Sequence, residues 1–163
     1  MTSLEEKLSK LKQLDENVTD QDWQAYKTKW LKSVNDLYGT IMYKYFQDYS
    51  DKGLMKFAII PVSRFEAYFG DYVTAILEIT LINYKSIVLE PIAAVTTENY
   101  GRLDFYLRGN ANKKVNIYRR LLGRNPFSKS SSYEWIIAKS YSIDDQFKLD
   151  KIQMEKLIEE WLS

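Results

Sequence analysis

Six basic and tyrosine side chains recur at alternating positions in two neighbouring segments, 102–108 and 114–120. Because successive side chains of a strand point to opposite faces, each set falls on one face of its own strand. Arginine offers a bidentate fork to carboxylate or phosphate, and tyrosine offers a flat ring for packing or stacking. If the turn at 109–112 joins the strands in simple register, we expect one partner-binding surface, made by Arg102, Tyr106, Arg108, Lys114, Tyr118 and Arg120.

The region around these residues is much more basic than the rest of the chain. Residues 101–132 contain eight Lys and Arg against one acid, Asp104, which gives +7. The whole chain carries +1, so the remainder carries −6. Such a lobe attracts an anionic partner, and we expect the acidic surface of another protein. The alternative is compensation within the molecule, by acids of the C-terminal helix such as Glu155, Glu159 and Glu160.

The residue types that are missing exclude several kinds of catalysis. The chain has no Cys and no His, which removes thiolate nucleophiles, the commonest general base and the usual zinc ligands. It contains no Gly-x-Ser-x-Gly motif, and its six glycines form neither a dinucleotide-binding nor a phosphate-binding loop. We therefore expect no cofactor and no catalysis, and hence a protein-interaction module of the accessory-subunit or immunity (inhibitor) type.

Two other functions remain open. The tyrosines of the basic face could stack on unpaired bases, which would make the protein a single-stranded nucleic-acid-binding protein. The usual RNA-recognition signature is missing, since residues 103–106 read Leu-Asp-Phe-Tyr. The second alternative is a hydrolase that holds Mg²⁺ or Mn²⁺ through the carboxylates of Asp71, Glu78, Glu90 and Asp104.

Helices must occupy both ends of the chain. Leucines at 4, 8, 11 and 14 form one stripe of a short N-terminal helix, which needs a surface to dock on because it is too short to be stable alone. Apolar residues from Trp23 to Tyr45 recur every three or four positions and predict a long second helix, with a kink at Gly39. Residues 150–162 predict a closing helix capped by Asp150. The helical N-terminal segment spans 2–50.

The middle of the chain, residues 57–140, changes to a period of two and predicts an antiparallel sheet of about six strands. We expect a first strand over 57–62 that stops near Pro61, a helical turn over 63–69, and strands over 71–82, 86–92, 102–108, 114–120 and 133–140. Segregated helices and hairpin-linked strands indicate the α+β class. The alternative architecture is a curved sheet wrapped on the long helix, which would be similar to nuclear-transport-factor-like folds.

We expect residues 1–163 to form a single domain. The longest apolar stretches are far shorter than the ~20 residues that a membrane span requires, so we expect no membrane association. The missing cysteines suit a reducing compartment, and we expect a cytoplasmic protein. The long and closing helices carry more aromatic and large apolar residues than one core stripe needs, and these could form a homodimer contact: Tyr38, Met42, Tyr43, Tyr49 and Trp161.

Overall fold

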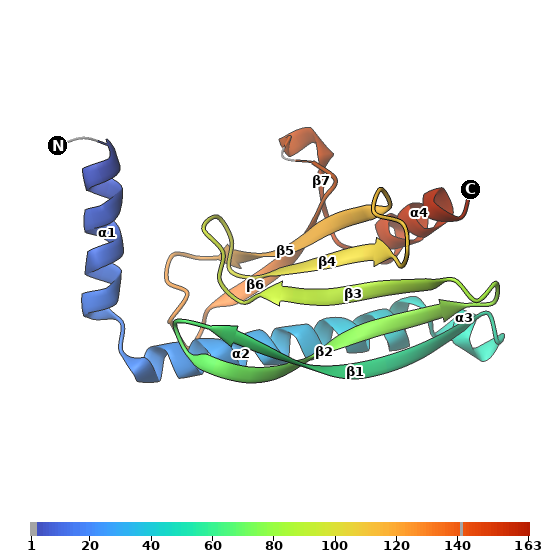
Figure 1. Ribbon diagram of the computed structural model, residues 1–163, viewed down its shortest axis with the longest axis horizontal. Helices are drawn as coiled ribbons and strands as arrows, with labels where there is room; N and C mark the ends of the chain where they lie inside the picture. The colour runs from blue at the N-terminus through green and yellow to red at the C-terminus, as the bar shows by residue number, and fades with distance from the viewer. Residues whose placement is uncertain (1–2, 141) are drawn as a thin grey trace.

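The computed structural model is organised around a seven-stranded antiparallel sheet (Figure 1). It describes residues 3–140 and 142–163, and for residues 11–17 it describes the backbone alone. Strands that are neighbours in the chain are neighbours in the sheet, so its order runs from β1 to β7. The strands are β1 (Met55–Glu66), β2 (Gly70–Leu81), β3 (Ser86–Ala93), β4 (Arg102–Leu107), β5 (Lys114–Leu122), β6 (Ser132–Ala138) and β7 (Gln146–Lys148). The α+β prediction is confirmed, and the sheet has one strand more than about six.

The helices lie at the two ends of the chain, as predicted. They are α1 (Ser3–Asn17), α2 (Asp20–Gly39), the π-helix η1 (Thr40–Tyr45), α3 (Gln47–Asp51), the 3₁₀ turn η2 (Ile143–Asp145) and α4 (Lys151–Leu162). Thr19 and Asp22 form a reciprocal capping box at the start of α2. The predicted irregularity at Gly39 is present as a change from α- to π-helical hydrogen bonding.

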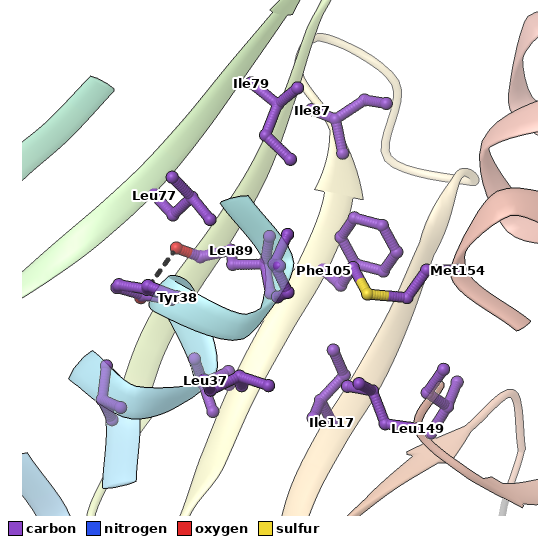
Figure 2. Packing of buried hydrophobic residues seen from close by; sticks show 14 of the residues in the cluster. Leu37, Tyr38, Leu77, Ile79, Ile87, Leu89, Phe105, Ile117, Leu149 and Met154 are labelled. Carbon is purple, nitrogen blue, oxygen red and sulfur yellow. Dashed lines mark hydrogen bonds between the residues drawn. The ribbon is translucent and has the colours of Figure 1, made fainter. Parts of the chain in front are cut away.

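One face of the sheet is covered by α2, η1 and α4, and the core lies between them (Figures 1 and 2). Trp30, Val34 and Ile41 of the long helical segment are completely buried. Phe105 of β4 packs against Trp161 of α4 with ring centroids 4.8 Å apart. The hydroxyl of Tyr38 donates to the carbonyls of Ala75 (2.7 Å) and Leu89 (3.2 Å), which satisfies a polar group inside the core. Figure 2 shows this hydroxyl directed at the Leu89 carbonyl.

Two sequence-based predictions were wrong. The first strand does not stop at Pro61, and the predicted helical turn over 63–69 is instead strand up to Glu66. Proline is tolerated there because β1 pairs only with β2, and an edge strand has no second partner that would need the missing N–H. Among the surplus residues, some of which we expected at the surface, Tyr43 is exposed, whereas Tyr38 and Trp161 are 2% and 6% exposed and belong to the core.

Helix α1 stands away from the helix-covered sheet (Figure 1). Its Leu4 and Leu8 are exposed, so the predicted docking of its apolar stripe is not met by these two side chains. Leu11 and Leu14, the other half of that stripe, lie outside the described side chains. No helix in the described part of the chain is long and apolar enough to cross a membrane.

Candidate binding face on the sheet

The six predicted residues come together on the sheet face opposite α2, because β4 and β5 pair in simple register. Arg102 lies opposite Tyr118, and Tyr106 lies opposite Lys114. Gly109 makes the reversal between the strands possible, since its φ of 81° is a conformation that residues with a side chain rarely adopt. Across residues 3–140 and 142–163, Figure 1 shows no helix lying over this face, which we call the outer face.

Every cation of the predicted set is paired with a carboxylate of the same face. Arg102 and Lys114 contact the two oxygens of Asp104 at 2.9 and 2.7 Å. Arg108 reaches Glu78 on β2 at 2.6 Å. Arg120 pairs with Glu134 on β6, to which it also donates hydrogen bonds. The guanidinium and ammonium groups are therefore held in fixed positions by acids of the strands themselves.

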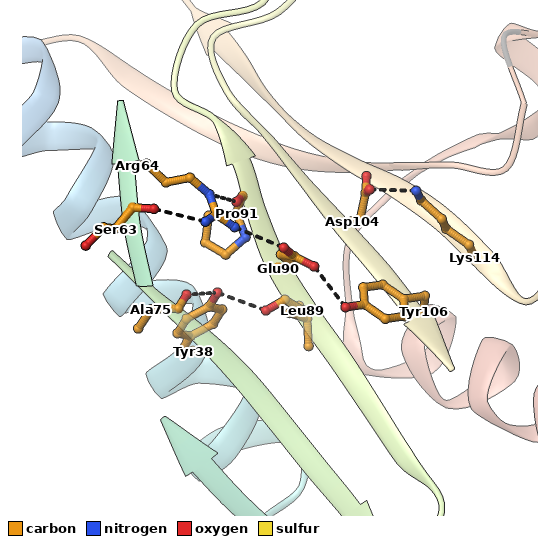
Figure 3. Close-up of polar contacts among 10 residues, drawn as sticks. All are labelled: Tyr38, Ser63, Arg64, Ala75, Leu89, Glu90, Pro91, Asp104, Tyr106 and Lys114. Carbon is orange, nitrogen blue, oxygen red and sulfur yellow. Dashed lines mark hydrogen bonds and ion pairs between the residues drawn. The ribbon is translucent and has the colours of Figure 1, made fainter. Parts of the chain in front are cut away.

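The two tyrosines donate to neighbouring strands. The Tyr106 hydroxyl donates to Glu90 on β3 at 2.8 Å, and Glu90 also pairs with Arg64 of β1 at 2.9 Å (Figure 3). Burial, and then the hydrogen bond to Glu90, raise the pKa of Tyr106 to about 12. Tyr118 donates to the side-chain oxygen of Gln146 on β7. Separate groups of ion pairs and hydrogen bonds thus cross the outer face from β1 to β7.

The cation is the more exposed member of each pair made by the predicted set. Arg108 and Arg120 are each 56% exposed, whereas their partners Glu78 and Glu134 are 20% and 16% exposed. Lys114 and Arg102 stand 42% and 36% exposed above Asp104, which is 6% exposed. The face is nearly neutral in sum, but an approaching molecule meets positive charge first.

The compensating acids are not those of the C-terminal helix. Glu155 accepts from the Tyr49 hydroxyl at 2.7 Å, and Glu160 lies 3.5 Å from Lys139. Lys113, a further cation of the basic lobe, donates to the carbonyl of Trp161 at 2.6 Å and so caps the C-terminal end of α4. Compensation within the molecule therefore exists, but through Glu78, Asp104 and Glu134.

The carboxylates proposed for a metal do not form a cluster. Glu90 and Asp104 face each other across β3 and β4 and border a cavity of about 440 Å³, but each is already held by cations. Glu78 is paired with Arg108, and Asp71 lies opposite Phe65, near the end of the β1–β2 hairpin. In the described ranges no three acidic side chains come close enough to hold a metal ion.

Sequence reasoning missed a second charged site, on the helix-covered side. Arg119 is completely buried and has no carboxylate partner among the residues that the structure describes. Its Nε donates to the Tyr100 carbonyl at 2.7 Å and its Nη1 to Ser33 Oγ at 2.9 Å, while its guanidinium lies 3.7 Å from the centre of the Tyr133 ring. The signal was present, because the alternation that places Val115 and Ile117 inward also places Arg119 inward.

Burial lowers the pKa of Arg119, and the nearby Tyr26 and Tyr133 oppose that shift. An arginine nevertheless remains charged in a protein, so this site holds a permanent positive charge behind α2.

No family model, no curated protein and no solved structure matches this chain.

Proposed function

We propose that the protein is a non-catalytic interaction module whose outer face docks an acidic surface of a partner protein. The observation that carries this proposal is the layering of charge, in which cations stand above carboxylates in every pair made by the predicted set. A partner carboxylate would contact arginine first and would add to a pair that already exists.

Preorganisation supports this use of the face. Long side chains lose rotamer freedom when they bind, and that cost is smaller where ion pairs and hydrogen bonds already fix them. Arginine and tyrosine are also the residue types enriched at the energetic centres of protein interfaces. We expect Arg108 and Arg120, the most exposed cations of the set, to contribute most to docking.

The same network disfavours nucleic acid as the partner. The hydroxyls of both tyrosines are already used by Glu90 and Gln146, so they are not free to hydrogen-bond to bases. A cytoplasmic location belongs to this proposal, and the lack of cysteine in the sequence supports it.

The test is affinity purification of the tagged protein from its host, followed by identification of what is retained. We expect a protein with an acidic surface, lost from the double variant Arg108→Glu/Arg120→Glu. The control is Lys44→Glu/Lys52→Glu, which makes the same change in charge at two exposed lysines off the sheet. Both variants must melt as cooperatively as the wild type. Equal retention by both variants, or recovery of nucleic acid alone, would refute the proposal.

A further inference from the structure

A groove that contains none of the six docking residues runs between α2 and β6. It encloses about 650 Å³, within the range of small-molecule sites. Lys29, Ser33, Leu37 and Thr40 line its helical wall at intervals of four, four and three residues, which places them on one flank of the helix. The other wall is formed by residues 131–135 of the chain, at the start of β6.

One end of this groove is positively charged without compensation. Lys29 Nζ donates to the carbonyls of Ser128 (2.8 Å) and Lys129 (2.9 Å) and to Ser131 Oγ (2.7 Å), none of which carries a negative charge. Behind the wall, buried Arg119 likewise has no carboxylate within ion-pair distance in the described chain. The two acids that line the groove are both neutralised, Asp36 by Lys32 and Glu134 by Arg120.

Ser33 connects the buried arginine to the groove. Its Oγ accepts from Arg119 Nη1 at 2.9 Å, so its own proton points elsewhere, and no acceptor for that proton occurs among the described residues. Arg119 Nη2 is also buried without an acceptor in hydrogen-bonding geometry within this part of the chain. Unused donors beside an uncompensated cation are the arrangement that binds an oxyanion.

Apolar and aromatic side chains also line the groove. Leu37, Tyr45, Trp135 and Leu149 line it, and Lys148 stands exposed at its rim without an ion pair to any residue described. An occupant would therefore need two parts, a charged head beside Ser33 and an apolar body along the aromatic and aliphatic walls.

We propose that this groove binds a small molecule that carries one oxyanion group, a phosphate or a carboxylate, on an apolar body. None of the six docking residues lines the groove, although Glu134 in its wall pairs with Arg120 of the docking face. Arg119 acts as a positioning residue, which orients Ser33 and supplies positive potential from behind it.

The test is calorimetric titration of the full chain with phenyl phosphate, benzoate and inorganic phosphate. We expect phenyl phosphate or benzoate to bind, and the tighter of the two identifies the head group. Inorganic phosphate should bind more weakly than phenyl phosphate because it lacks the apolar body. No binding of either aromatic probe at about 10 mM, or equal affinity for phenyl phosphate and inorganic phosphate, would overturn the proposal.

Variants locate the head group. Ser33→Ala should weaken binding of the aromatic probe by about tenfold, because a hydrogen bond to a charged group is lost. Thr28→Ala is the matched control, since Thr28 is an exposed hydroxyl of the same helix that bonds back to Gln24 and does not line the groove.

A second variant avoids the contact with Arg119, in case Ser33→Ala disturbs the fold. Lys148→Glu at the exposed rim should weaken binding several-fold, and the effect should shrink as salt rises. Lys52→Glu, away from the groove, should leave affinity unchanged. Wild-type affinity in both Ser33→Ala and Lys148→Glu would place the probe elsewhere and overturn the proposal.

Discussion

Arg119 and Arg120 are neighbours on β5, yet they meet opposite environments. Arg120 is exposed on the outer face and is paired with a carboxylate. Arg119 is fully buried against aromatic rings, a carbonyl and a hydroxyl, with no carboxylate in the described chain. Because strand side chains alternate, one step along the chain separates a cation that a protein partner can reach from one that acts inside the fold.

This difference predicts unequal contributions to stability. Exposed ion pairs contribute little, because water screens them and the long side chains lose freedom. A buried and tightly packed side chain contributes much more, because its removal leaves a cavity and unsatisfied polar groups. The outer face should therefore tolerate substitution, whereas the cluster of Arg119, Trp30 and Gly101 should not.

The largest expected effect is at Gly101, where the buried cluster is tightest. Its φ is 125°, and a Cβ there would lie 2.7 Å from Cε3 of Trp30. Gly101→Ala should lower the free energy of unfolding by about 3 kcal/mol or more, through backbone strain and overpacking. Chemical denaturation measures this change.

Gly39→Ala is the control for that substitution. Gly39 has helical φ and ψ angles, and nothing lies within 4 Å of the position of its Cβ. The alanine should stabilise the protein by up to about 1 kcal/mol. Similar effects of the two alanines would show that Gly101 is not closely packed on Trp30.

The second prediction compares the two arginines directly. Arg119→Ala should lower the free energy of unfolding by roughly 2–4 kcal/mol. It opens a cavity among aromatic rings and leaves the Tyr100 carbonyl and Ser33 Oγ without the donor that they now have. Arg120→Ala should cost less than about 1 kcal/mol. Equal losses in urea denaturation would contradict the distinction between the two faces.

Much of this arrangement was predictable from residue patterns. The alternation in β4 and β5 was enough to place the six residues on one face, and the capping residue Asp150 was enough to locate the start of α4. The continuation of β1 through Pro61 could not be predicted, because only the sheet order shows that this strand lies at an edge.

The ion pairs and the groove could not be predicted for a similar reason. Glu78 lies 30 residues before Arg108 in the chain, and Ser33 lies far from Arg119. Only the register of β2, β3 and β4, and the seating of α2 on the sheet, bring these groups together. A pattern within one segment carries no information about such distant contacts.

The third prediction concerns pH and the network of the outer face. The pKa of Tyr106 is raised from 10.0 to about 12, so folding favours its neutral form. Its stabilising contribution is complete below pH 10 and is lost as pH rises toward 12. The difference in melting temperature between wild type and Tyr106→Phe should therefore narrow above pH 10.

Tyr84→Phe serves as the control for this measurement, because the Tyr84 side chain is 90% exposed. The difference in melting temperature between Tyr84→Phe and wild type should stay the same from pH 8 to 12. A difference between wild type and Tyr106→Phe that is constant from pH 8 to 12 would contradict the link between Tyr106 and Glu90.

The smallest expected effect is an exchange of charge within one outer pair. Arg120→Glu alone should destabilise the protein by about 1 kcal/mol, because it faces Glu134 with a like charge. Adding Glu134→Arg should restore stability to within about 0.5 kcal/mol of wild type. Additive losses in this double-mutant cycle would show that the pair does not act as a unit.

The most direct test of the central proposal is arginine-specific chemical labelling of the protein, free and in complex with its captured partner. Arg108 and Arg120, each 56% exposed, should react when the protein is free and become protected in the complex. Acetylation of Lys44 and Lys52 should be the same in both states. Full reactivity of both arginines in a saturated complex would contradict docking through the outer face.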